Sequence, residues 1–472
     1  MADQDLTFLS ATELVDHYRA KTVSPVEATR AVLDQIGRYG EAINAFILVD
    51  EDSALAAARA SEDRWRTGEP KGLLDGVPTS IKDLILTKGW PTLRGSLAIN
   101  PDQPWDEDAP VVARLREHGA VLVGKTATPE FGHKGVTDSP VSGITRNPWN
   151  LDKTPGGSSG GASAAVAAGM GPLAIGTDGG GSIRIPASFA GIFGIKPSFG
   201  RVPAYPASPF GSVAHVGPMT RTVADAALML TVIAGPDWRD WTALPYDDED
   251  YRRNLDQPLS GVRIAYSETL GMPNVRLDPE VRDCVATAAR QFQSLGATVI
   301  EADPVWPYEP GAVFNVYWSI GAAKLIDDMT DDQVAKMEDS LTEYAEVGRK
   351  MSGLDIKVAE LQRTANGAAL NKFFEEYDLL LSPTMPIPAF DAGVPVPSDD
   401  YAGEPLRWTP YTFPINLSKN PAASVPCGFT KAGLPVGLHV VGPMFREVSV
   451  LRAARAYEQA HDWHTRRPDL VS

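Results

Sequence analysis

Serines set among closely spaced glycines are the residues of this chain best suited to chemistry. Ten glycines lie between Gly156 and Gly181, and Ser158 and Ser182 stand within and directly after this run. A serine hydroxyl becomes a nucleophile when a neighbouring base takes its proton. Histidine is the usual base, but a lone lysine upstream, Lys82 in GVPTSIKDLIL, is another candidate. The combination indicates a serine hydrolase whose base is a lysine.

Lys82 could act as a base only if its pKa fell from about 10.4 to near neutrality. Burial of an unpaired ammonium lowers a lysine pKa by as much as about 3–5. Lys82 lies in an apolar run beside Ile81 and Leu84, which suits such burial. From these residues alone, a structural lysine paired with Asp83 or another acid is the commoner arrangement.

The segment 156–161, GGSSGG, admits several interpretations. A flexible linker would continue with polar residues, whereas this segment runs into ASAAVAAGM, which is compatible with a tightly packed helix. Phosphate-binding and dinucleotide-binding loops need glycine spacings that are absent here. The segment does match G-x-S-x-G, the nucleophile turn of α/β-hydrolases. An esterase that pairs Ser158 with His215 or His439 is therefore an alternative.

A second glycine-rich segment, TDGGGS at 177–182, predicts an anion-binding turn. Successive N–H groups of Gly179, Gly180, Gly181 and Ser182 can point into one concavity and stabilise an oxyanion. An ordinary glycine-rich turn is the alternative for this segment.

Composition excludes several classes of function. The 472 residues carry a formal net charge of −17, which disfavours nucleic acid and anionic membrane surfaces as partners. Two cysteines do not make a disulfide framework, and neither cysteine nor histidine shows metal-ligand spacing, so we expect no metal. No signal peptide or membrane-spanning run is visible, which predicts a cytoplasmic protein.

Short apolar runs alternate with helical patterns along most of the chain, which predicts an α/β sheet covered by helices on both faces. Residues 1–70 are predicted to be helical, with a capping box that begins at Ser24. Residues 306–377 are predicted to be a helical cover over the substrate pocket. The expected strands are 81–86, 121–123, 173–175, 262–266, 298–301, 379–382 and 436–441, and the expected helices between them include 109–118, 159–168 and 279–295.

The ordered motifs resemble those of the amidase signature family, and the resemblance covers nearly the whole chain. The motifs are GVPTSIKD at 76–83, NPWN at 147–150, PGGSSGG at 155–161, TDGGGSIRIPA at 177–187, GIKPSFGRVP at 194–203 and LPVGLHVVGP at 434–443. The resemblance implies one α/β domain over 1–472, with a catalytic core at 74–203 and a central, mostly parallel mixed sheet.

The resemblance also implies a role for each motif residue. Ser182 matches the nucleophile, Ser158 matches a bridging serine that follows a cis peptide bond, and Lys82 matches the base. The proton of Ser182 would pass through Ser158 to Lys82, and an acyl-enzyme would then be hydrolysed by water. The residues 179–182 match the oxyanion hole, while Asp178, Arg184 and Thr177 are expected to brace the loops by hydrogen bonds. The expected partners are a small-molecule amide and water, with no cofactor; homodimers are common in such families, and we keep one as a hypothesis for this chain.

Two rival functions follow from related sequences. One is a glutamine-hydrolysing subunit of a tRNA amidotransferase that works inside a complex; such sequences usually carry Gln where this chain has Ile185, which favours a free-standing amidase. The other is a binding module that has lost catalysis, which the presence of all three catalytic residue types disfavours.

The substrate is less well determined than the reaction. Aryl, alkyl and peptide amides, carbamates and ureas all occur in the family. We expect the pocket to be lined from the segment 131–139, by Phe131, Thr137 and Asp138, and from an aromatic cluster in the helical cover, by Tyr317 and Trp318.

Overall fold

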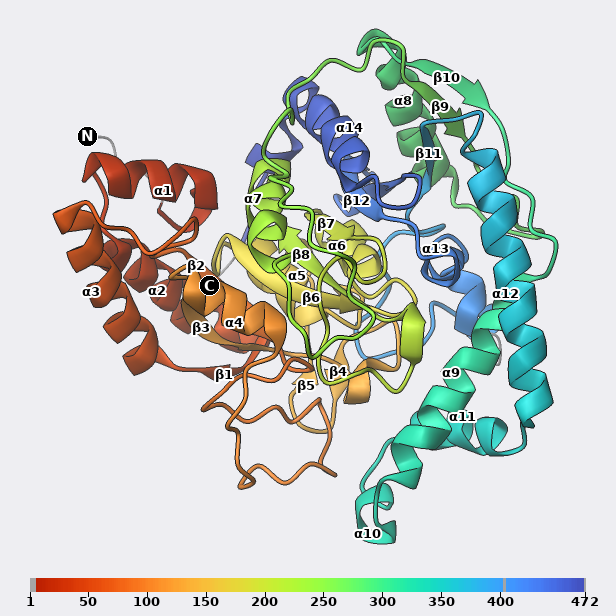
Figure 1. The fold of residues 1–472 in the computed structure, drawn as a ribbon, viewed down its shortest axis with the longest axis horizontal. Helices are drawn as coiled ribbons and strands as arrows, with labels where there is room; N and C mark the ends of the chain where they lie inside the picture. Colours follow the sequence, from red (N-terminus) through yellow and green to blue (C-terminus); the bar gives the residue numbers. More distant parts are fainter. Residues whose placement is uncertain (1–5, 402–404, 471–472) are drawn as a thin grey trace.

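One large sheet organises the chain, whose computed structural model describes residues 6–401 and 405–470. The remaining positions of the expected domain, 1–5, 402–404 and 471–472, lie outside the described residues. Eleven strands follow one another across this sheet in the order β1-β3-β2-β6-β8-β7-β12-β13-β11-β9-β10, and β4 and β5 form a separate ribbon (Figure 1). The strands are β1 Phe46–Val49, β2 Pro78–Lys82, β3 Val121–Thr126, β4 Asp138–Ser139, β5 Gly143–Ile144, β6 Leu173–Asp178, β7 Phe193–Lys196, β8 His215–Thr220, β9 Arg263–Tyr266, β10 Thr298–Glu301, β11 Leu379–Pro383, β12 Ala422–Phe429 and β13 Pro435–Val441.

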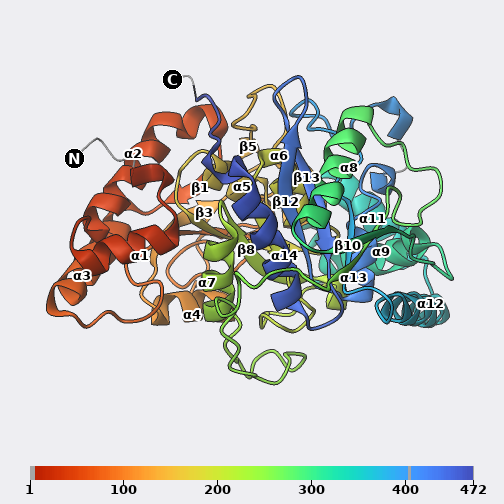
Figure 2. The same ribbon diagram turned by 90° about the horizontal axis from the view of Figure 1, so that it is seen from above.

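Helices cover both faces of the sheet, as predicted. They are α1 Ala11–Ala20, α2 Pro25–Ile43, α3 Glu51–Thr67, α4 Pro110–Glu117, α5 Gly160–Ala167, α6 Arg184–Ala190, α7 Val223–Ile233, α8 Pro279–Ser294, α9 Pro310–Asp327, α10 Asp331–Val334, α11 Asp339–Arg349, α12 Gly353–Phe373, α13 Phe413–Ser418 and α14 Glu447–Ala460. Successive strand residues face opposite layers: Leu173 and Ile175 of β6 pack in the core that includes α7, α8 and α14, whereas Ala174 packs against α5 and α6 (Figure 2).

The balance of strand directions corrects one prediction. Six of the ten neighbouring strand pairs in the described sheet are antiparallel and four are parallel, so the mixed sheet is not mostly parallel. The physical reason is visible at β12 and β13, which only residues 430–434 connect. A connection this short permits antiparallel pairing alone, because parallel neighbours need a long crossover.

The N-terminal part is mostly helical, with β1 as an exception to the prediction for residues 1–70. The capping box at Ser24 is confirmed, since Ser24 Oγ accepts the N–H of Glu27 and the Glu27 carboxylate accepts the N–H of Ser24. At the other end of the molecule, residues 306–377 contain α9 to α12, which stand together beside the sheet (Figure 1). No described helix has the length and apolar character that crossing a membrane requires.

The strand expected at 81–86 ends earlier, at Lys82. The N–H of Asp83 donates to the carbonyl of Thr126 at the end of β3, and the chain then turns away. Lys82 therefore lies at the carboxyl end of β2, between β3 and β6, where side chains from neighbouring strand ends meet.

The helix α5 packs against the sheet so closely that only glycine fits at one position. A Cβ atom at Gly161 would lie 2.4 Å from the backbone nitrogen of Ala127 and 2.6 Å from the carbonyl oxygen of Ala45. Because α5 begins directly after Ser159, this contact holds the serine-containing loop against β3.

We predict that Gly161→Ala lowers the free energy of unfolding by about 1–3 kcal/mol, since the added methyl group must displace backbone. Gly37→Ala is the matched control: it also replaces a helical glycine, but its Cβ would meet nothing within 4 Å, so it should raise stability by up to about 1 kcal/mol. Denaturant unfolding of both variants checks the pair. Equal effects in the two would contradict the packing argument.

Candidate active site

Lys82 is fully buried (0% exposed) and points at three hydroxyl groups. Its Nζ lies 2.8 Å from Ser158 Oγ, 2.8 Å from Ser159 Oγ and 2.9 Å from Thr177 Oγ1. These hydroxyls come from the loop before α5 and from β6, so the strand and the helix start together form the site. The structure thus joins two of the predicted catalytic residues, Lys82 and Ser158.

No carboxylate forms an ion pair with Lys82 among the described residues. Burial lowers the pKa of Lys82 well below its usual range, and the more distant Asp178 opposes this only in part. Asp83, the alternative partner, instead lies 3.5 Å from the buried Lys125. Adjacent residues at the end of a strand point to opposite faces, so the side chains of Lys82 and Asp83 point away from each other. The environment therefore favours an uncharged amine at Lys82.

Ser158 follows a cis peptide bond from Gly157, as the resemblance implied. Gly157 is confined, since a Cβ there would lie 2.4 Å from the carbonyl oxygen of Val136. Thr137 holds the same loop: its hydroxyl donates to the carbonyl of Gly156 (2.8 Å) and accepts the N–H of Gly160 (3.0 Å). Ser158 is thereby fixed by backbone contacts on both sides, with its own side chain left for Lys82.

Ser182 lies beside this loop and borders the same cavity as Ser158. The N–H of Ser159 donates to the carbonyl of Ser182 (3.1 Å), which ties the two serine segments together. The Ser182 side chain is buried, at 7% exposure. Within the described residues its hydroxyl makes no hydrogen bond, to Ser158 or to any other group.

The glycine turn before Ser182 offers fewer free donors than the sequence suggested. The N–H of Gly181 donates to Asp178 Oδ1 (2.8 Å), so it is already engaged. The N–H groups of Gly179, Gly180 and Ser182 have no acceptor among the described residues. A Cβ would lie 3.1 Å from the Trp318 ring at Gly179 and 2.8 Å from the Phe314 ring at Gly180, so a larger residue at either position would require these rings to shift.

A buried ion pair between Asp178 and Arg184 holds the glycine turn in place. Arg184 donates to both carboxylate oxygens of Asp178, through Nε (2.9 Å) and Nη2 (2.9 Å). Asn416 donates to Asp178 Oδ1 (2.8 Å) and accepts from Arg184 (2.6 Å). The guanidinium holds the pKa of Asp178 well below its usual range against the opposing effect of burial. The two charges therefore compensate each other, and they position Gly181.

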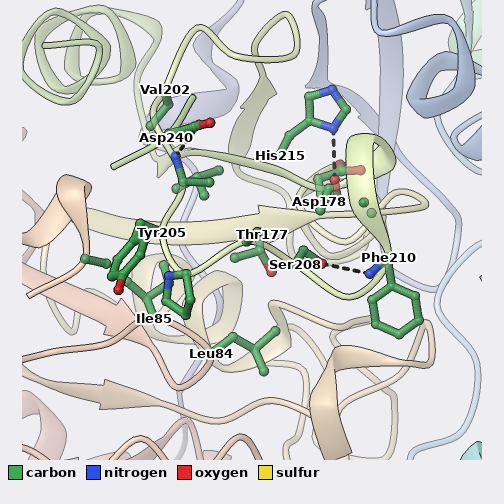
Figure 3. A pocket seen from close by; sticks show the side chains of 18 of the residues that line it. Leu84, Ile85, Thr177, Asp178, Val202, Tyr205, Ser208, Phe210, His215 and Asp240 are labelled. Carbon is green, nitrogen blue, oxygen red and sulfur yellow. Dashed lines mark hydrogen bonds between the residues drawn. The ribbon is translucent and has the colours of Figure 1, made fainter. Parts of the chain in front are cut away.

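Neither candidate histidine of the esterase alternative reaches a serine of the site. His439 Nε2 contacts Arg184 Nη1 at 3.1 Å. His215 borders the cavity, but its Nδ1 is directed at the carbonyls of Val213 (2.7 Å) and Asp178 (3.2 Å) (Figure 3). Burial lowers the pKa of both rings well below the usual range, which favours their neutral forms. The geometry therefore favours Lys82 over histidine as the base.

A cavity of about 520 Å³ opens over the serines. Apart from the site residues it is lined mainly by the segment 198–216, a loop that leads into the start of β8, whose Tyr205 and Phe210 rings lie on opposite sides of Thr177 (Figure 3). This loop was not predicted as lining. Its signal in the sequence is the Pro-rich run RVPAYPASPF at 201–210, which begins within the family motif at 194–203.

Two of the five residues predicted to line the pocket do so, namely Phe131 and Trp318. The other three are directed elsewhere. Thr137 is taken up by the serine loop, Asp138 forms an ion pair with Lys134, and the Tyr317 ring lies under the Arg363 guanidinium, 4.9 Å from its centroid. None of these three borders the described cavity.

Comparisons with known proteins agree with this geometry. A family model described as Amidase matches residues 27–451. The chain belongs to the amidase signature family. Within it, an acylamidase of Rhodococcus erythropolis is 37% identical over 99% of this chain and 98% of its own length. One subunit of the glutamyl-tRNA(Gln) amidotransferase of Myxococcus xanthus is 39% identical over 98% of this chain and 100% of its own length. The crystal structure of a bacterial aryl acylamidase, also an amidase signature enzyme, superimposes with a TM-score of 0.90 at 33% identity, covering 97% of both chains.

Arg184→Met tests the buried ion pair of this amidase. We expect the free energy of unfolding to fall by about 3–5 kcal/mol, because Asp178 would remain buried without its cation. The matched control is Arg19→Met, whose ion pair with Asp16 is largely exposed and should change stability little. Urea unfolding measures both, and similar losses would contradict the assignment. Arg184→Lys should recover only part of the stability, because a point charge cannot bond both oxygens in the same way.

Proposed function

We propose that this amidase hydrolyses a small-molecule amide through Ser182 as nucleophile, Ser158 as proton relay and Lys82 as base. The observation that carries the proposal is the contact between a buried, unpaired lysine amine and Ser158 Oγ at 2.8 Å. An amine without a carboxylate partner can exist uncharged, and only the uncharged form accepts a proton. The two acylamidases among its relatives support the same type of reaction.

The hydrogen bonds around Lys82 support a defined direction for the proton. The Ser159 hydroxyl donates to the carbonyl of Thr177 (3.1 Å), so its oxygen must accept from Lys82. A neutral amine has two N–H bonds and one lone pair. When Thr177 Oγ1 accepts the second N–H, the lone pair faces Ser158, whose hydroxyl then donates its proton to Lys82.

Catalysis would proceed from this arrangement. Ser158, as it loses its proton to Lys82, takes the proton of Ser182, whose Oγ attacks the carbonyl carbon of the amide. The developing oxyanion accepts from free N–H groups of Gly179, Gly180 and Ser182. The proton returns through Ser158 to the leaving nitrogen, the C–N bond breaks, and water hydrolyses the acyl-enzyme.

The relay needs one local rearrangement, since the Ser158 and Ser182 hydroxyls are not hydrogen-bonded to each other as they stand. We propose that rotation of the Ser182 side chain supplies it, since the backbone of Ser182 is already held against Ser159. Catalytic hydrogen bonds often shorten only when substrate is bound.

The amidotransferase alternative rests on a relative that is 39% identical, against 37% for the acylamidase. Ile185 argues against it: this side chain packs in an apolar cluster with Val136, Phe189 and Trp408, where a glutamine amide would lack partners. We therefore propose a free-standing amidase. The cytoplasmic location and the homodimer remain predictions.

Loss of activity in the triad variants is the direct test. Ser182→Ala, Ser158→Ala and Lys82→Ala should each lower kcat/KM for a neutral anilide by at least about 10³-fold, by analogy with other catalytic serines and bases. His215→Ala and His439→Ala are the controls, and both should keep measurable activity. A fluorophosphonate probe should label wild type but not the Ser182 variant. If the Lys82 variant were active and either histidine variant inactive, the mechanism would be falsified. A preference for glutamine as substrate would favour the amidotransferase function.

The pH dependence follows from the lowered pKa of Lys82. Activity needs the neutral amine, so kcat/KM should fall as pH drops below the Lys82 pKa in the folded enzyme and should level off above it. The unfolded chain keeps its lysine protonated up to about pH 10.4. Between the folded and unfolded pKa values the unfolded state binds more protons, so Lys82 makes stability rise with pH, by at most about 1.4 kcal/mol per pH unit.

Lys82→Met should reduce that slope when unfolding free energies are measured from pH 6 to pH 9. Lys88→Met is the matched control, because Lys88 is exposed, and it should leave the slope unchanged. Buried Lys125 and Lys196 also have lowered pKa values, so the slope should diminish rather than vanish. An unchanged slope in the Lys82 variant would mean that this lysine is charged in the folded enzyme.

A further inference from the structure

Four charged side chains border the substrate cavity: Arg94, Asp178, Arg239 and Asp240. Three of them have partners in the protein. Asp178 binds Arg184, Arg239 binds Asp237 through two guanidinium nitrogens, and Asp240 accepts from the backbone of Ala204 and from Thr242. The Arg94 guanidinium has neither a hydrogen bond nor an ion pair among the described residues, although it carries five N–H donors.

The backbone of Arg94 is fixed close to the catalytic groups. Its N–H donates to the carbonyl of Asp83 (3.1 Å), the residue after Lys82, and its carbonyl accepts the N–H of Phe131 (2.7 Å). Gly132, the next residue, borders Ser158: a Cβ there would lie 3.1 Å from Ser158 Oγ. Arg94 also has a positive φ of 56°, which is uncommon for a residue other than glycine. The Arg94 backbone is therefore hydrogen-bonded to two segments, at 83–85 and 131–132, that both contribute residues to the cavity lining.

The charge of Arg94 is not neutralised locally. Asp83 is the carboxylate that interacts with it electrostatically, but Asp83 is already the partner of the fully buried Lys125. Two cations thus share one carboxylate. Burial disfavours the charged form of Arg94, yet a guanidinium stays protonated in proteins. A partly buried cation without an anion is unfavourable, and an anionic ligand in the cavity would remove that cost.

We propose that Arg94 determines specificity by binding a carboxylate of the amide substrate, at a position away from the scissile carbonyl. A guanidinium matches a carboxylate with two parallel hydrogen bonds. The substrate class is therefore an amide that bears a free carboxylate, held by Arg94 while its amide carbonyl lies at Ser182. This inference rests on the proposed amidase function.

Two matched substrate pairs test the proposal. N-(4-nitrophenyl)butanamide and N-(4-nitrophenyl)succinamate differ by a carboxylate on the acyl part, and acetanilide and 4-acetamidobenzoate differ by one on the amine part. In at least one pair, wild type should favour the carboxylated member in kcat/KM. Arg94→Gln should lower that preference by roughly ten- to a hundredfold, the range expected for a charge-assisted hydrogen bond, and Arg94→Lys should keep part of it.

Arg239→Gln is the matched control, since it removes a cation from the same cavity wall that Asp237 already holds. It should keep the preference for the carboxylated member. An equal loss in Arg239→Gln and Arg94→Gln would show that general positive potential, and not a contact with Arg94, is responsible, and would overturn the proposal. The proposal is also overturned if wild type shows no preference for the carboxylated member of either pair. That measurement uses the wild-type enzyme alone, so it does not depend on whether a variant folds.

Measurements of ligand binding test the role of Arg94 separately from the proposed amidase activity. In the Ser182→Ala background, calorimetric titration should show tighter binding of the carboxylated member, and adding Arg94→Gln should weaken it by roughly tenfold or more. Equal binding of both members of each pair would overturn the role of Arg94 even if wild type hydrolyses them. Carboxylate-dependent binding without any hydrolysis by wild type would instead sustain Arg94 and contradict the amidase function.

Discussion

The burial of one lysine amine without a carboxylate partner is the constraint on which the site depends. Two carboxylates lie near Lys82, and each is held by a different cation. Asp83 is directed to Lys125 and Asp178 to Arg184. If either carboxylate had paired with Lys82, the pKa of that lysine would rise and the amine would stay charged. The pairing of its neighbours is therefore what leaves Lys82 free to act as a base.

The ion pair of Asp178 with Arg184 also shapes the anion-binding turn. Both oxygens of Asp178 are occupied, and one of them accepts the N–H of Gly181. This contact orients the turn, while the N–H groups of Gly180 and Ser182 on either side of Gly181 have no acceptor in the part of the chain that the structure describes. A single buried carboxylate therefore serves two purposes, because it neutralises Arg184 and fixes the backbone that would receive the oxyanion.

The sequence, together with its family resemblance, predicts which residues could carry the chemistry, but it does not predict the residues that only the fold brings to the cavity. Lys82, Ser158 and Ser182 stand in ordered motifs, and the start of α5 after Ser159 follows from the change from glycine and serine to alanine. In contrast, Thr137 and Asp138 were assigned to the pocket by proximity along the chain, and both serve local contacts instead.

The sheet and the cavity wall show why such assignments fail. The mostly parallel sheet that the resemblance implied was wrong, because strand direction depends on which strands become neighbours, and the apolar runs of this sequence do not show that. The loop 198–216 has no periodicity, and its place over the serines depends on distant contacts, such as that of Phe199 with Lys419, whose Nζ lies 4.7 Å from the ring centroid. Arg94 was not predicted, because only the fold shows that Asp83, the carboxylate near it, is paired with Lys125.

The backbone leaves little freedom for the geometry of the proton relay. Ser159 donates its N–H to the carbonyl of Ser182, and its hydroxyl oxygen accepts an N–H of Lys82, so one residue contacts both the segment of the proposed nucleophile and the proposed base. Ser158, its neighbour, is held by the loop that Thr137 braces. Displacing either segment would therefore disturb the groups that we propose as base, relay and nucleophile. Among the described residues the Arg94 side chain makes no hydrogen bond within this network, so the proposed substrate preference and the proposed proton path use different side chains on a shared backbone.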